Sequence, residues 1–191
     1  MARGLSVVAV DPSASMLAVL SANHPALTVV RASAEDTGLP DRSFDSIFVA
    51  QAWHWIDPVA ASAEAARLLR PGGYLTMIWN RRVLEGWQAE FDALQEGVRG
   101  IDLVDEHDSA ARPPFGNRRE VTVFWQREVP ADDFLLSYTT HSPFLLADPA
   151  EQARRMGAWR TLLAANAGDA VTEHYASVAW RFQLPEGDRD A

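Results

Sequence analysis

Residues 5–13 read LSVVAVDPS, a short apolar run that ends in an aspartate, a proline and a serine. The run at 5–10 is β-branched and almost continuously apolar, which is typical of a strand buried on both faces in a parallel sheet. After Asp11, the apolar positions between Met16 and Leu20 follow helical spacing. This stretch therefore predicts a strand, a turn and a helix in that order.

The same alternation continues to about residue 80. Strands are expected at 27–30, 43–50 and 74–79, and a helix that opens at Asp57-Pro58 runs to about residue 69. The sequence Arg-Pro-Gly-Gly at 70–73 predicts a break between that helix and the next strand, because proline ends a helix and glycine permits positive φ. Alternating strands and helices predict an α/β fold.

The pattern is less regular after Asn80. Helices are expected at 87–98, 132–140 and 149–165, strands at 121–129 and 176–184, and a long polar loop at 102–119. Length alone favours a single domain over residues 1–191.

Composition limits the classes of function. A formal net charge of -9 and an isoelectric point near 4.9 argue against a nucleic-acid partner. No apolar run approaches membrane-spanning length, and a cytoplasmic location is expected. The chain has no cysteine, and its histidines make no ligand spacing, so we expect no metal site.

Residues that follow the strands are the candidates for chemistry, because ligands of open parallel sheets bind beyond the carboxyl ends of the strands. Asp11 either accepts hydrogen bonds from the ribose hydroxyls of a nucleoside-containing cofactor or only caps the helix that follows it. The segment 32–40 either lies beside an adenine edge or is an ordinary polar loop.

Two tryptophans and a histidine directly follow the strand at 43–50. His54 could act as a general base or orient a substrate, with Trp53 and Trp55 beside it. Alternatively, these side chains only pack beneath the next helix. Later in the chain, Arg81, Arg82, Arg118 and Arg119 could bind a substrate carboxylate, although surface arginines are more often only solvated.

Four motifs in order carry a family resemblance: VVAVDPS at 7–13, ASAEDTGLP at 32–40, SFD at 43–45 and LLRPGGYL at 68–75. This succession resembles the class I S-adenosylmethionine-dependent methyltransferases of the type 11-like group. The AWHWID segment at 52–57 is similar to relatives of trans-aconitate methyltransferase, which act on small molecules. The resemblance implies a Rossmann-like sheet, mostly parallel, with a C-terminal antiparallel strand pair.

The resemblance also implies S-adenosylmethionine as the cofactor and assigns its contacts. Asp11 matches the acidic ribose ligand, and Met16 matches the position whose side chain packs near the adenine. The adenine-edge loop and the residues that pass the methionine moiety are matched by Ser33, Ala34, Glu35, Ala50 and Gln51. Residues 1–80 would form the cofactor side, and 81–191 the substrate side, for a small-molecule acceptor.

The chain departs from the family at its beginning, where no strand with a glycine-rich turn precedes Leu5. We therefore expect an N-terminally truncated domain in which the first, central strand is missing and its neighbours keep unpaired backbone. The native protein would start further upstream, or a second copy would fill the gap as a homodimer, or the sheet would close and lose the cofactor site.

These expectations leave three functions open. The first is methyl transfer to a small molecule, conditional on a complete cofactor site. A noncatalytic methyltransferase-like remnant or interaction subunit is the alternative. An NAD-dependent oxidoreductase is disfavoured, although an acidic residue that ends the second strand also marks that fold.

Overall fold

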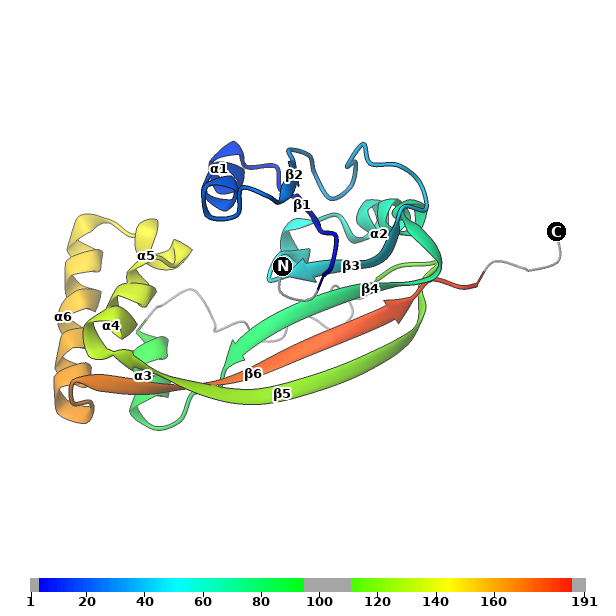
Figure 1. Cartoon of the computed structure of the whole chain (residues 1–191). Helices are drawn as coiled ribbons and strands as arrows, with labels where there is room; N and C mark the ends of the chain where they lie inside the picture. The colour runs from blue at the N-terminus through cyan, green and yellow to red at the C-terminus, as the bar shows by residue number, and fades with distance from the viewer. Residues whose placement is uncertain (1–3, 95–110, 187–191) are drawn as a thin grey trace. The chain divides into compact units, whose positions relative to one another are not determined.

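The computed structural model describes residues 4–94 and 111–186 (Figure 1). Two sheets form in this part of the chain. β1 (Val8–Val10) pairs in parallel with β2 (Thr28–Val30), so that Val10 lies opposite Val30. The second sheet has the strand order β3-β4-β6-β5, with β3 (Phe44–Ala50), β4 (Leu69–Arg82), β5 (Gly116–Pro130) and β6 (Ala170–Gln183).

The second sheet combines both strand directions. β3 and β4 run in parallel, with Ala50 opposite Ile78. β6 is antiparallel to β4, since the Val83 N–H donates to the His174 carbonyl and the Leu184 N–H donates to the Gly73 carbonyl. The predicted α/β class and the C-terminal antiparallel strands are confirmed. Within the described residues, β1 pairs only with β2, and β3 pairs only with β4.

Local capping explains where the two longest helices begin. α2 (Pro58–Leu68) starts after Asp57, whose carboxylate accepts from the Val59 and Ala60 N–H groups. α6 (Pro149–Asn166) starts after Asp148, which accepts from the Glu151 N–H. In both, proline occupies the first helical position, where a missing N–H costs nothing. Both helices lie close to their predicted ranges.

The other helices are α1 (Ala14–Asn23), α3 (Trp87–Ala93), α4 (Ala131–Thr139) and α5 (Ser142–Leu145). α5 was not predicted. The predicted extension of the helix at 87–98 beyond Leu94, and the predicted loop as far as residue 110, lie outside the described residues. None of the helices in 4–94 and 111–186 is long and apolar enough to cross a membrane.

The prediction of a break at 70–73 was only half right. The helix does stop at Leu68, but the following residues already belong to β4. A register shift opposite Phe44 and Ser46 accommodates them, and Gly72 takes a φ of 79°. A Cβ at Gly73 would lie 2.8 Å from the Arg70 carbonyl oxygen, so only glycine fits there.

Two strands at the C-terminal end are longer than predicted. β5 begins at Gly116, inside the predicted loop, and β6 begins at Ala170 rather than at residue 176. The first strand is shorter than predicted, and its side chains are only half-buried rather than buried on both faces. With β2 as its single neighbour among the described residues, β1 lacks the flanking strand that complete burial requires.

The chain forms two compact units. One comprises residues 1–78, 106–120 and 179–191, and contains β1, α1, β2, β3 and α2. The other comprises 79–105 and 121–178, and its core is an aromatic cluster from α3, α4 and α6 whose fully buried members are Phe91, Phe134, Tyr138 and Trp159.

Candidate functional site

Asp11 lies where the sequence predicted it, directly after β1. Its N–H donates to the Val30 carbonyl at the end of β2, so the carboxyl ends of both strands meet beside it. One carboxylate oxygen accepts from the Ser13 N–H at 2.7 Å. The helix cap itself is Ser13, whose hydroxyl accepts from the Met16 N–H at 3.3 Å. Asp11 therefore orders the turn and leaves its other oxygen, Oδ2, without a hydrogen bond to the described residues.

Met16 is the second predicted cofactor residue on this turn. Its side chain is 61% exposed, whereas the neighbouring Leu17 is buried. Helical spacing explains the difference, because adjacent residues of a helix point in directions about 100° apart. Met16 thus presents a polarizable apolar surface to the outside of the first turn of α1.

The segment 33–41 is an anchored loop. Ser33 accepts from the Asp36 N–H at 3.2 Å, and Glu35 accepts from the Asp57 N–H at 2.9 Å, which joins the loop to the start of α2. The bond to Asp57 holds the pKa of Glu35 below its ordinary value. Ala34 is half-buried between these two contacts.

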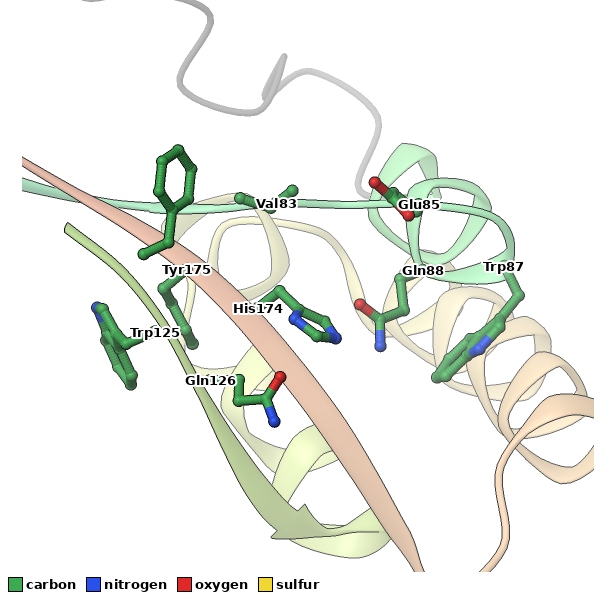
Figure 2. Close-up of a pocket in the computed structure, with 9 residues that line it drawn as sticks. Val83, Glu85, Trp87, Gln88, Trp125, Gln126, His174 and Tyr175 are labelled. Atoms are coloured by element: carbon green, nitrogen blue, oxygen red, sulfur yellow. The ribbon is translucent and has the colours of Figure 1, made fainter. Parts of the chain in front are cut away.

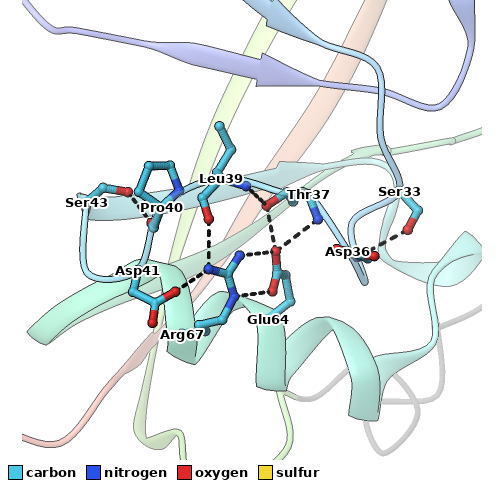
Figure 3. A network of polar contacts seen from close by, with 9 residues as sticks. All are labelled: Ser33, Asp36, Thr37, Leu39, Pro40, Asp41, Ser43, Glu64 and Arg67. Carbon is cyan, nitrogen blue, oxygen red and sulfur yellow. Dashed lines mark hydrogen bonds and ion pairs between the residues drawn. The ribbon is translucent and has the colours of Figure 1, made fainter.

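A polar network on α2, which the sequence analysis did not predict, anchors this loop (Figure 3). Glu64 is 8% exposed and accepts from the Thr37 hydroxyl at 2.6 Å and its N–H at 2.9 Å. Arg67 donates to both oxygens of Glu64, at 2.7 and 2.8 Å, to the Leu39 carbonyl at 2.7 Å, and pairs with Asp41. The sequence feature that could have indicated this network is a Glu and an Arg three residues apart in an Ala-rich helix.

Acid should weaken this network. Hydrogen bonds from Arg67 and Thr37 lower the pKa of Glu64 from 4.5 to about 2. A lowered carboxyl pKa stabilises the fold above the unfolded value and loses that effect as the pH falls through the folded value. We expect urea unfolding to show stability falling from pH 4.5 toward 2, and Glu64→Gln to remove part of that slope.

The matched control for this experiment is Glu128→Gln, at an exposed position of β5. It should keep the wild-type slope. A Glu64→Gln variant with the full wild-type slope would show that the Glu64 contacts do not contribute to acid stability.

Ala50 is the last residue of β3, beside β4, and Gln51 directly follows it. The Gln51 N–H donates to the Ile78 carbonyl at 2.9 Å, and Gln51 has a φ of 54°. Positive φ is uncommon for a residue other than glycine, and such positions cluster at functional sites. The backbone thus turns sharply at the edge of the sheet where ligands of this architecture bind.

The Trp-His-Trp turn after β3 separates its three side chains. Trp53 is 2% exposed and belongs to the core, whereas Trp55 is 78% exposed. His54 lies against Trp55, with ring centroids 4.7 Å apart, and partial burial lowers the pKa of its imidazole. Trp53 thus packs in the core, as the second of the two alternatives predicted. His54 and Trp55 are exposed and remain candidates for substrate contact.

Two of the four arginines considered for carboxylate binding pair with carboxylates of the chain itself. Arg82 contacts Glu173 at 3.2 Å and the Tyr175 hydroxyl at 3.3 Å, and Arg118 contacts Glu120 at 3.1 Å. No group of three or more His, Cys, Asp or Glu side chains in 4–94 and 111–186 is arranged to hold a metal ion.

Comparison with known proteins shows which family this chain is similar to. The family model described as a methyltransferase domain matches residues 1–77. Uncharacterized methyltransferases of Mycobacterium bovis and Mycobacterium tuberculosis are 37% identical over 165 residues, which cover 85% of this chain. The match spans 66% of the length of these curated relatives.

Solved structures extend the similarity to the fold. A proposed type II methyltransferase from Anaeromyxobacter dehalogenans aligns with a TM-score of 0.67 and 25% identity, over 94% of this chain and 81% of that one. Phosphoethanolamine N-methyltransferase 2 of Haemonchus contortus, in complex with S-adenosyl-L-methionine, aligns with a TM-score of 0.50 and 20% identity, over 95% of this chain and 44% of that one.

Proposed function

Since the chain belongs to the class I methyltransferases, we propose that it binds S-adenosylmethionine and transfers the methyl group to a small-molecule acceptor. The proposal rests on the position of the Asp11 carboxylate. This carboxylate stands at the carboxyl ends of two parallel strands, with one oxygen fixed by the Ser13 N–H and the other free to accept a ribose hydroxyl.

The residues present fit such a cofactor in their chemistry. A carboxylate suits the ribose hydroxyls, the exposed Met16 thioether suits the flat face of an adenine, and the anchored loop offers Ser33 and Ala34 for its edge. The sharp backbone turn at Gln51 would pass the methionine moiety. When bound, the cofactor would supply an activated methyl group on a sulfonium.

The chain would contribute mainly positioning and the removal of water around the reacting atoms. His54 is the candidate for accepting a proton from the acceptor. Partial burial lowers its imidazole pKa, which favours the neutral, proton-accepting form near neutral pH. A small-molecule acceptor is favoured over a nucleic acid by the net charge of -9.

Replacing Asp11 by alanine should weaken S-adenosylhomocysteine binding roughly 10- to 100-fold, because hydrogen bonds to a charged group contribute about 1.5–3 kcal/mol. Isothermal titration calorimetry on the full chain measures the effect, with a thermal melt to confirm folding. Asp132 is exposed in the first turn of α4. Asp132→Ala is therefore the matched control, and this variant should bind S-adenosylhomocysteine as tightly as the wild type does.

Two results would count against the proposal. If Asp11→Ala bound as tightly as the wild type, Asp11 would not be the ribose ligand. If the folded wild-type chain did not bind at all, the noncatalytic alternative would replace methyl transfer.

A further inference from the structure

A hollow of about 670 Å³ lies in the unit formed by residues 79–105 and 121–178, within the range of small-molecule pockets (Figure 2). It is bounded by the end of β4, the start of α3 and the strands β5 and β6. Its polar lining consists of Glu85, Gln88, Gln126 and His174. Trp87 and Trp125 also line it, one from α3 and the other from β5.

The walls and floor of the hollow are held in place by the fold. The Val83 N–H donates to the His174 carbonyl at 2.8 Å, which fixes the end of β4 against β6. Trp125 stacks on Tyr175, with centroids 4.4 Å apart and planes 9° from parallel, and its indole N–H donates to the Ser177 hydroxyl at 2.7 Å. The pocket is therefore preformed on this side.

Several polar atoms in the hollow have no partner among the described residues. Gln88 donates its amide N–H to the Thr172 carbonyl at 2.9 Å, which leaves its amide oxygen available. The carboxylate of Glu85 and the side chains of Gln126 and His174 form no hydrogen bond or ion pair within 4–94 and 111–186. These groups can be satisfied by a ligand.

The lining of the hollow carries negative charge. Among the described residues of the lining, Glu85 supplies the carboxylate and none is an arginine. Arg82 and Arg127 adjoin lining residues in sequence, but both pair with Glu173, at 3.2 and 2.7 Å. A carboxylate in a lining that also contains tryptophan rings favours a cation, through charge-assisted hydrogen bonding and cation–π attraction.

We propose that this pocket binds a small molecule that combines a flat apolar ring with a protonated amine. The ring would lie against Trp87 or Trp125, and the ammonium would donate to Glu85 and to the amide oxygen of Gln88. The inference stands independently of methyl transfer, since every residue that carries it lies outside the proposed cofactor contacts.

Three probes of matched shape test the proposal: phenethylamine, 2-phenylethanol and phenylacetate, which carry positive, neutral and negative charge at neutral pH. Saturation-transfer NMR and calorimetry on the full chain should rank them in that order. Glu85→Gln should weaken phenethylamine about tenfold and leave 2-phenylethanol unchanged. Glu128→Gln, which makes the same charge change outside the pocket, should alter neither.

Equal binding of phenylacetate and phenethylamine would overturn the proposal, as would the absence of binding by any probe at millimolar concentration. An equal loss of phenethylamine binding in Glu85→Gln and Glu128→Gln would also overturn it, because the preference would then reflect only the acidic surface of the chain. S-adenosylhomocysteine binding, measured in parallel, keeps this result separate from that of the proposed cofactor site.

Discussion

Replacing Glu173 by alanine is expected to lower the free energy of unfolding by about 3–5 kcal/mol, because it removes the shared partner of two arginines. Glu173 is 2% exposed. One of its oxygens accepts from the Tyr175 hydroxyl at 3.0 Å and contacts Arg82 at 3.2 Å, and the other accepts from Arg127 at 2.7 Å. Without this carboxylate, the mostly buried Arg82 guanidinium keeps its charge and loses its counterion.

A second substitution tests that explanation. Adding Arg82→Met to Glu173→Ala should recover part of the lost stability, because it removes the unpaired charge and keeps much of the side-chain volume. Urea unfolding measures both variants, and Glu128→Ala, at an exposed site on β5, should change stability by no more than about 0.5 kcal/mol. If the double variant were less stable than Glu173→Ala, packing rather than charge would explain the loss.

Replacing Trp159 by alanine should also cost about 3–5 kcal/mol, the usual range for a buried Trp or Phe truncated to alanine. Its side chain is fully buried, and its ring lies 5.5 Å from those of Phe91 and Phe144. Its indole N–H donates to the Phe91 carbonyl at 2.9 Å and so links α6 to α3. The substitution would leave a cavity and remove this hydrogen bond to the Phe91 carbonyl.

Two comparisons separate these contributions. Trp159→Phe keeps an aromatic ring and loses the hydrogen bond, so it should cost roughly 1–3 kcal/mol. Trp55→Ala truncates the same residue type at a site that is 78% exposed, and should change stability by no more than about 0.5 kcal/mol. Equal losses at the two tryptophans in urea unfolding would contradict the assigned burial.

Local signals predicted the two longest helices well. An Asp-Pro pair marks the start of both α2 and α6, since the aspartate side chain caps the first turn and proline tolerates the first helical position. The alternation of apolar strands with helices likewise indicated the α/β class. These features depend on residues only a few positions apart, so the sequence predicts them without knowledge of which elements pack together in the fold.

Strand length could not be predicted in the same way. Residues 70–73 look like a turn, but they belong to β4, where the Gly73 carbonyl accepts from the Leu184 N–H and the Gly72 N–H donates to the Pro185 carbonyl. Those partners are more than a hundred positions away in the sequence. A strand extends as far as a neighbour pairs with it, and that neighbour is placed by the tertiary fold.

The same division applies to the candidate sites. Asp11, the loop after β2 and the turn after β3 could be named from the sequence, because each directly follows an apolar strand and matches an ordered family motif. Only the tertiary structure showed that Glu64 and Arg67 anchor the loop, that Trp53 is buried while Trp55 is exposed, and that Glu85, Gln126 and His174 line one pocket. A sequence motif shows which residues follow a strand. Whether a side chain is buried, and which side chains line the same pocket, depends on contacts between segments far apart in the chain.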